Sequence, residues 1–142
     1  MTIVALHSNN VAQYKGLFDT LSNLSEAPPI SIDEIKKRIS LLDQTGGKIF
    51  AGIVDNKIVA CATLMIEYKI IRKGAKCGYV EDVATHKDHQ GKGYGFQIVE
   101  HITNYAKSQD CYKVVLHCSE KVASFYERHN YIKKNVSMEV RF

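Results

Sequence analysis

Apolar residues near the start of the chain recur every three to four positions, which is the spacing of one face of an α-helix. The members of this set are Val11, Tyr14, Leu17, Phe18, Leu21 and Leu24. They follow a polar run at 8–10 that is typical of a helix start, so we expect a first amphipathic helix here. After two prolines, Ser31 and Glu34 form a capping box ahead of a second apolar stripe, which predicts a second, shorter helix.

After two consecutive glycines the apolar residues alternate with polar ones, as expected for β-strands. Residues 48–54 and 58–68 lie on either side of a polar turn at 55–57, which predicts a β-hairpin with a long second strand. The basic segment 69–76 is expected to be a loop. Further strands are predicted over 78–85, 112–118 and 132–142.

Two more helices complete the predicted elements. A long helix is expected from Gly93, and a short one over 122–129. The apolar stripe of the long helix consists of Ile98, Val99, Ile102, Tyr105 and Ala106. This order of elements within one domain, 1–142, predicts an α/β (α+β) fold in which helices cover both faces of a mixed central sheet.

Composition and charge narrow the possible functions. The chain has 45% hydrophobic and 24% charged residues, as ordinary folded proteins do, and its net charge of +4 is mild and scattered. Nucleic acid is therefore a poor candidate partner, whereas a small anionic ligand such as a phosphate ester fits. No apolar run approaches the roughly 20 residues that span a bilayer, and no signal-peptide pattern opens the chain, so we expect a cytoplasmic protein without membrane contact.

Cysteine and histidine spacing argues against a metal. The four cysteines show no close pairing and are expected to be reduced thiols. His86 and His89 have no third ligand nearby in the sequence. No metal site is expected.

A glycine-rich loop, Gln90-Gly91-Lys92-Gly93-Tyr94-Gly95, lies between a predicted strand and the start of the long helix. Backbone N–H groups at a helix N-terminus lack intrahelical partners, and glycines let a ligand approach them closely. Such a loop holds a pyrophosphate, although three glycines before a helix also occur in turns without a ligand. The pattern is not GxxxxGK[ST], and the βαβ unit of a dinucleotide-binding fold is missing.

The loop matches Q/R-x-x-G-x-G/A, with Gln90, Gly93 and Gly95 at the defining positions, and so resembles the pyrophosphate loop of GNAT acetyltransferases. Within that superfamily, five further segments resemble the glucosamine-6-phosphate N-acetyltransferases. They are LSEAPPIS at 24–31, EYKIIR at 67–72, GYVEDVA at 78–84, CYKVVL at 111–116, and SEK with FYER at 119–128. The resemblance implies transfer of an acetyl group from acetyl-CoA to the amine of glucosamine 6-phosphate, without a covalent enzyme intermediate.

The resemblance also assigns residues to acetyl-CoA. They are Val83, Ala84, Gln90, Gly91, Lys92, Gly93, Tyr94, Gly95 and Tyr126. A bulge in the strand before the loop would let Val83 donate its backbone N–H to the thioester carbonyl. The Tyr126 phenol would protonate the departing thiolate. The alternative for Tyr126 is a packing role beside Phe125 on an aromatic helix face.

A second group is assigned by the resemblance to the acceptor: Ser25, Lys69, Arg72, Glu81, Asp82, His117 and Arg141. The basic members and Ser25 would bind the sugar phosphate, for which the fork of an arginine is well suited. Glu81 and Asp82 are neighbours on a strand, so we expect their side chains to point to opposite faces and not to act as a pair. His117 is assigned to catalysis chiefly through its backbone carbonyl. A homodimer sharing the C-terminal strand and the basic loop is implied as well.

The sequence departs from the family pattern at a few positions. Val122 stands where the family usually has asparagine, and Ser25, Arg72 and His117 replace threonine, histidine and aspartate. Two alternatives therefore stay open: a GNAT enzyme that acetylates another amine, such as a protein N-terminus, a polyamine or an aminoglycoside, and an inactive protein that senses CoA.

Overall fold

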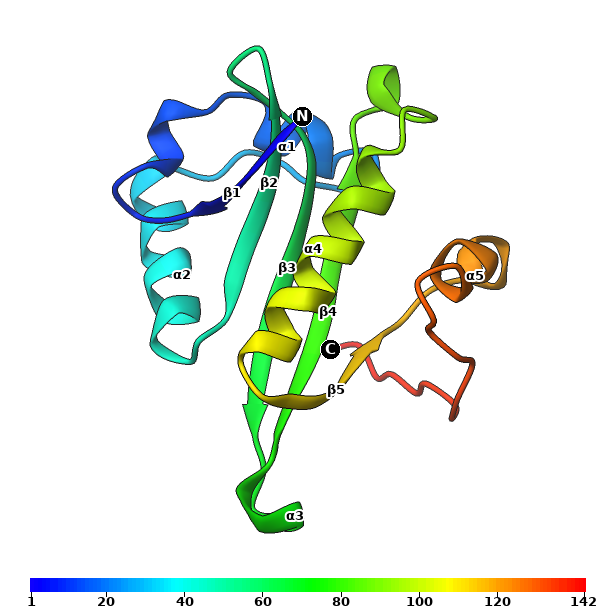
Figure 1. Cartoon of the computed structure of the whole chain (residues 1–142). Helices are drawn as coiled ribbons and strands as arrows, with labels where there is room; N and C mark the ends of the chain where they lie inside the picture. Colours follow the sequence, from blue (N-terminus) through cyan, green and yellow to red (C-terminus); the bar gives the residue numbers. More distant parts are fainter.

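The computed structural model describes residues 1–142 and is built around a five-stranded sheet with the order β1-β2-β3-β4-β5 (Figure 1). The strands are β1 (Thr2–Leu6), β2 (Lys48–Val54), β3 (Lys57–Tyr68), β4 (Lys76–Thr85) and β5 (Cys111–Leu116). Neighbouring strands are antiparallel except β4 and β5, which pair in parallel. A parallel pair requires a crossover, and the helix between these two strands provides it.

Helices lie on both faces of this mixed sheet, as the sequence predicted. They are α1 (Leu17–Leu21), α2 (Ile32–Gln44), α3 (Ile71–Gly74), α4 (Tyr94–Ser108) and α5 (Glu120–Glu127), with 3-10 turns η1 (Val11–Gln13) and η2 (Lys87–His89). The long helix α4 crosses one face, and α1 and α2 cover the other (Figure 1).

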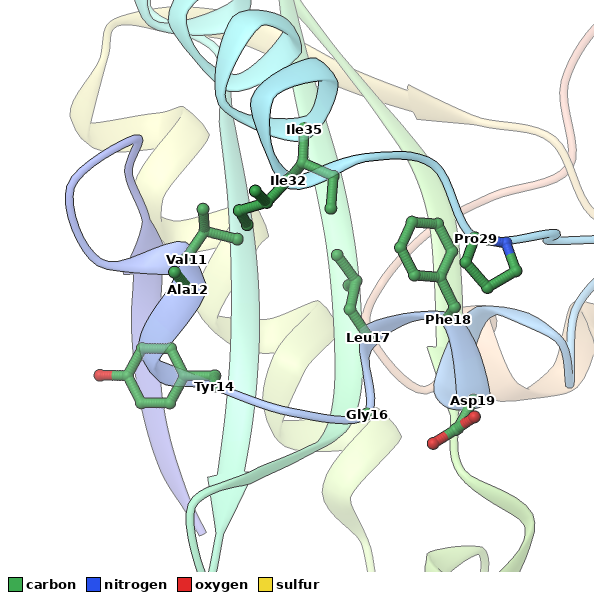
Figure 2. Close-up of a pocket in the computed structure, with 10 residues that line it drawn as sticks. All are labelled: Val11, Ala12, Tyr14, Gly16, Leu17, Phe18, Asp19, Pro29, Ile32 and Ile35. Carbon is green, nitrogen blue, oxygen red and sulfur yellow. The ribbon is translucent and has the colours of Figure 1, made fainter.

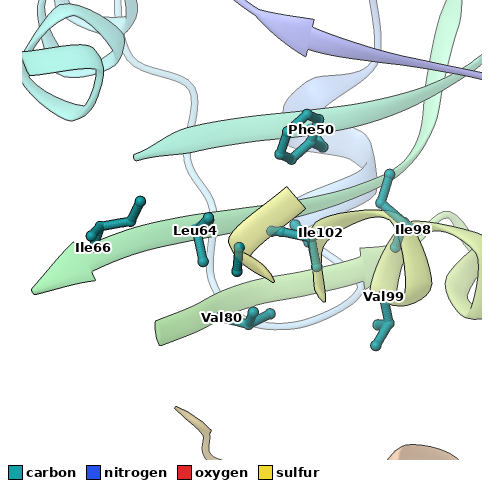
Figure 3. Packing of buried hydrophobic residues seen from close by; sticks show 9 residues of the cluster. Phe50, Leu64, Ile66, Val80, Ile98, Val99 and Ile102 are labelled. Carbon is teal, nitrogen blue, oxygen red and sulfur yellow. The ribbon is translucent and has the colours of Figure 1, made fainter. Parts of the chain in front are cut away.

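The core beneath α4 comes from the predicted apolar stripe of that helix. Figure 3 shows Ile98 and Ile102 of α4 against Leu64 and Val80 of the two central strands, and all four are at most 2% exposed. Burying each such side chain contributes about 1.5–3 kcal/mol. This packing fixes the start of α4, and with it the glycine loop, relative to the end of β4.

The opposite core joins β1, α1 and α2 to the same strands. Leu6, Ile39 and Ile58 are almost fully buried here. Thr20 of α1 is also buried, and its hydroxyl donates a hydrogen bond of 2.7 Å to the Ile58 carbonyl. A buried hydroxyl needs such a partner, so this bond holds α1 against the start of β3.

The first predicted helix is wrong as one continuous element, because the chain breaks between η1 and α1. Gly16 adopts φ 84°, a left-handed conformation outside the helical range. The neighbouring Lys15 exchanges backbone bonds with the β2–β3 turn, accepting from Ile58 at 2.8 Å. Pairing with that turn satisfies backbone groups that a helix would otherwise have used.

The ends of the chain also differ from the sequence prediction. The first residues form β1, which pairs with β2 and was not predicted, because five residues give little periodicity. The closing strand predicted over 132–142 is absent, and this tail has no ladder partner within the chain. Its apolar residues Val136, Met138 and Phe142 are therefore exposed.

Candidate functional site

The glycine loop lies at the N-terminus of α4, where the sequence placed it. Gly91 and Gly93 adopt φ values of 76° and 77°, which side-chain-bearing residues rarely adopt, and no atom lies within 4 Å of the position that a Cβ would take. The open space beside both glycines leaves the backbone accessible. Gly95 differs, because a Cβ there would lie 3.0 Å from the Thr85 hydroxyl oxygen.

The backbone N–H groups of residues 91–96 donate to no carbonyl and no side chain of the chain, and the first helical bond runs from Gln97 to the Gly93 carbonyl. These free donors surround the positive end of a fifteen-residue helix. Such an arrangement fits a pyrophosphate group. Gln90 holds the loop back toward β4 with a long bond from Nε2 to the Thr85 carbonyl, 3.4 Å.

A bulge interrupts β4 just before this loop. Glu81 pairs with Thr63, but Ala84 pairs with Cys61, so Asp82 and Val83 together face a single residue of β3. Asp82 takes a left-handed φ of 52°, which bends the strand. The extra residue leaves backbone groups outside the regular ladder at the position predicted for Val83.

Beside the bulge, β4 and β5 separate. Their parallel pairing runs as far as Val80 and Leu116 and stops there. A cavity of about 160 Å³ opens at this point. It is lined by Leu24, Val80, Glu81, Asp82, Val83, His117 and Tyr126.

The cavity thus brings together five of the predicted site residues. Both Glu81 and Asp82 contribute to its wall, because the bulge breaks the alternation that would have sent them to opposite sides. His117 Nδ1 lies 4.0 Å from a Glu81 carboxylate oxygen, and both side chains are partly exposed. Leu24 also lines the cavity; it was not assigned to the site, although it begins the 24–31 segment that resembles the family.

Tyr126 of α5 faces this cavity from a half-buried position. Burial raises the pKa of its phenol to about 12, with smaller contributions from Cys118 and Tyr131. The phenol therefore keeps its proton at any physiological pH and acts as a donor. Its ring packs edge-on against Phe125, with centroids 4.9 Å apart. Packing and proton donation are compatible here.

The predicted phosphate-binding residues, in contrast, are not gathered at the cavity. Lys69 pairs with Glu67 at 2.9 Å, and Glu67 also accepts a 2.9 Å bond from the Tyr79 hydroxyl. These two bonds lower the pKa of Glu67, the Lys69 bond contributing most. Arg72 lies over the Tyr112 ring, 5.1 Å from its centroid, at the far end of the β3–β4 hairpin.

Two other members of the phosphate set also lie outside the cavity. Arg141 is exposed in the tail and pairs with Glu139 at 2.9 Å. Ser25 follows Leu24 directly and is exposed. Within one chain, therefore, the structure does not assemble a phosphate site from these residues.

A larger cavity, about 470 Å³, lies on the α1–α2 side of the molecule (Figure 2). Its wall is mostly apolar, and Figure 2 shows Phe18, Pro29 and Ile32 around it. It contains none of the predicted site residues. No cluster of three or more metal-ligating side chains occurs in the structure. No helix is long and apolar enough to cross a bilayer, and the cytoplasmic location stays a prediction.

The fold and this site define the class of the protein. The profile of the Acetyltransferase (GNAT) family matches residues 18–131, and the chain belongs to that family. Among its relatives is glucosamine 6-phosphate N-acetyltransferase 1 of Dictyostelium discoideum, 33% identical over 89% of this chain and 82% of that protein. The Arabidopsis thaliana glucosamine 6-phosphate N-acetyltransferase is 30% identical over 90% of this chain and 89% of its own length.

Solved structures give the same result for the fold. The crystal structure of glucosamine-6-phosphate N-acetyltransferase from Arabidopsis thaliana superposes with a TM-score of 0.90 at 29% identity, covering 99% of this chain and 97% of that one. An acetyltransferase from Trypanosoma brucei superposes with a TM-score of 0.86 at 28% identity, covering 99% of each chain. The predicted family and fold are thus confirmed.

Proposed function

We propose that this chain transfers the acetyl group of acetyl-CoA to the amine of glucosamine 6-phosphate. The observation that carries the proposal is the cavity at which the β4 bulge, His117 and Tyr126 meet, on the strand that leads into the glycine loop. Relatives that bear the name of this activity match along most of the chain. The known activity of those relatives supports this choice of acceptor over another amine.

The residues of the glycine loop fit the pyrophosphate of acetyl-CoA, which supplies the acetyl thioester when bound. Gly91 and Gly93 leave open space beside a backbone whose N–H groups have no other partner. The assigned set also includes Gln90, Lys92, Tyr94 and Gly95, with Val83, Ala84 and Tyr126 nearer the reacting end. We infer that backbone donors bind most of the negative charge, because they are fixed before the ligand arrives.

At the cavity, each group has a separate task. We infer that the Val83 N–H polarises the acyl carbonyl from its place in the bulge, outside the regular pairing of β4 with β3. The His117 carbonyl accepts a hydrogen bond from the attacking amine and orients its lone pair. Tyr126, which is protonated because its pKa is about 12, donates its proton to the departing sulfur, and the proton that the amine nitrogen loses on becoming an amide returns to the phenol.

Two acidic residues of the cavity would bind the amino sugar that accepts the acetyl group. Glu81 and Asp82 lie at its wall and would accept hydrogen bonds from sugar hydroxyl or ammonium groups. His117 Nδ1 lies 4.0 Å from a Glu81 carboxylate oxygen, so an acceptor group bound by Glu81 would also lie beside His117. These roles rest on the position of the two carboxylates, since neither forms an ion pair with a lysine or arginine and only His117 approaches Glu81.

We also infer a homodimer, which would complete the phosphate site. The tail 132–142 exposes apolar side chains along its length, including Ile132 at 77% and Phe142 fully, and the hairpin tip exposes Ile70 at 95%. Contiguous exposed apolar side chains such as these are typical of a protein–protein interface. Arg141 lies in one such segment, while Lys69 and Arg72 lie in the other. A second copy would bring these basic groups to the cavity from outside the single chain.

The test is an acetyl-transfer assay with purified protein. CoA release is measured with glucosamine 6-phosphate, glucosamine, a polyamine, an aminoglycoside and an N-terminal peptide, and mass spectrometry identifies the product. We expect N-acetylglucosamine 6-phosphate, with unphosphorylated glucosamine used at least tenfold less well, because one lost charge-assisted bond costs about 1.5–3 kcal/mol. Preference for another amine would leave only the general acetyltransferase assignment. Tight CoA binding without turnover on any amine would indicate a sensor.

A further inference from the structure

A row of aromatic rings in contact connects the first turn of α4 to Tyr126. Phe96 stacks on the imidazole of His129, with ring centroids 3.8 Å apart and an interplanar angle of 28°. His129 in turn meets Phe125 edge-on at 5.4 Å, and Phe125 meets Tyr126 at 4.9 Å. Since Phe96 directly follows the glycine loop, this row spans the distance between the loop and the phenol.

Beyond Tyr126, the ring of Tyr131 lies edge-on at 6.1 Å and is held to α4 by a hydrogen bond. Thr103 donates its hydroxyl proton to the Val99 carbonyl at 2.7 Å, so the Tyr131 hydroxyl is left to donate to Thr103 Oγ1, 2.8 Å away. The backbone N–H groups of His129 and Tyr131 both donate to the Tyr126 carbonyl, at 2.8 and 3.2 Å. The turn after α5 therefore closes around Tyr126 itself.

This row matters because α5 reaches the core through few side chains, chiefly the partly buried rings of Phe125 and Tyr126. Only Ala123 of α5 is buried, so the helix inserts no large aliphatic side chain into either core. Its position relative to α4 depends instead on aromatic rings at its C-terminal end, which contact both the core and one another. His129 is the central member of that row and its only titratable group with an ordinary pKa near neutrality.

The surroundings of His129 suit a neutral imidazole. Its Nε2 atom is enclosed and makes no hydrogen bond. An imidazolium would carry an N–H there with no acceptor, at the cost of an unsatisfied buried donor. Burial lowers the pKa of His129, the nearby Arg128 on the same segment lowers it further, and Glu100 of α4 acts in the opposite direction.

We propose that His129, in its neutral form, is a positioning residue that holds Tyr126 at the cavity by stacking on Phe96 and packing edge-on against Phe125. This inference rests on the proposed function only in giving Tyr126 its catalytic task. It predicts that protonation or removal of the imidazole lets α5 shift and moves the phenol away from the departing sulfur. A displacement of about 1 Å is enough to reduce turnover strongly.

A double-mutant cycle on kcat tests the proposal. His129→Ala should lower kcat about tenfold or more in the wild-type background but less than twofold in a Tyr126→Phe background, because the phenol it positions is gone. His129→Phe keeps an aromatic ring and should recover most of the loss. His101, which packs edge-on against Phe50 at 4.7 Å, is the matched control: His101→Ala should act alike in both backgrounds. Equal effects of His129→Ala in both backgrounds would overturn the proposal.

A second measurement needs no turnover and so separates this proposal from the proposed function. In tyrosine-labelled protein, the ring resonance of Tyr126 is identified by its loss in Tyr126→Phe and followed with pH. It should shift with a midpoint below the ordinary histidine pKa of 6.5, and the shift should vanish in His129→Phe. A Tyr126 resonance whose chemical shift does not change with pH in the wild type, or still changes with pH in His129→Phe, would show that His129 does not position the phenol. This holds even for a protein that fails to acetylate glucosamine 6-phosphate.

Discussion

Substitution of Gly93 by glutamate would test the anion site at the helix start most directly. The residue has a φ of 77°, and no atom lies within 4 Å of where its Cβ would be. Steric crowding inside the folded chain is therefore absent, and only the left-handed backbone penalises a side chain, by about 1–2 kcal/mol. Gly93→Ala carries the same backbone penalty without filling the site, so it serves as the matched control.

The two variants should differ in binding and not in stability. A glutamate at 93 places its side chain and a negative charge where the pyrophosphate would meet the free N–H groups of residues 91–96. Losing two charge-assisted hydrogen bonds costs about 3–6 kcal/mol, which is roughly a hundredfold or more in affinity. Gly93→Gln should fall between, because it fills the space without the repulsive charge.

Calorimetric titration with CoA gives the dissociation constants, and thermal unfolding gives the stabilities. We expect similar losses of Tm in all three variants and a large loss of CoA affinity only in Gly93→Glu and, less, in Gly93→Gln. If Gly93→Glu binds CoA as tightly as Gly93→Ala does, the loop is not the pyrophosphate site. If Gly93→Ala alone abolishes binding while the fold stays intact, backbone conformation matters more than access.

Further predictions concern the phenol, the phosphate, the tail and the buried imidazole. Tyr126→Phe should lower kcat at least tenfold with little change in CoA affinity, because a proton donor acts mainly in the transition state; an unchanged kcat under chemistry-limited conditions would leave Tyr126 with a packing role. Arg141→Ala should lower kcat/KM for glucosamine 6-phosphate roughly ten- to a hundredfold and leave CoA binding unaffected, and wild-type kinetics with the phosphorylated sugar would exclude a phosphate contact. Deletion of 135–142 should convert a dimer into a monomer in sedimentation experiments; a protein that is monomeric before deletion would refute the inferred homodimer. Because the pKa of His129 is lowered in the folded state, the unfolded chain binds more protons as pH falls below 6.5, so stability decreases there; denaturant unfolding of His129→Phe should show a smaller decrease.

Several parts of the site could be predicted because their signals are local. The glycine loop is recognisable because Gly91 and Gly93 take a positive φ that glycine adopts most readily, and because Gly95 has little room for a Cβ at the helix start. The β-hairpin turn is similar: Asp55 and Asn56 both adopt left-handed conformations, as a two-residue turn of this type requires. The residue types within such a loop or turn are enough to predict its backbone conformation.

Other parts could not be predicted, because they depend on residues distant in sequence. The bulge in β4 was expected only from the family resemblance, and nothing local marks the left-handed Asp82, since the bulge depends on the register between β4 and β3. The interruption of the first predicted helix similarly depends on the β2–β3 turn, which captures the backbone of Lys15. In both cases a tertiary hydrogen bond pattern outweighed a clear local preference.

By itself, the sequence determined the helices and strands with strong periodicity, the order that makes a mixed sheet, and the loop that suits a pyrophosphate. Only the tertiary structure decided that Glu81, His117 and Tyr126 share one cavity, and that Lys69, Arg72 and Arg141 lie away from it in the single chain. The physical reason is the separation in sequence over which the deciding interactions act. Periodicity and turn chemistry act over a few residues, whereas a site forms where β4 and β5 separate and α5 packs back, and these contacts depend on the whole sheet.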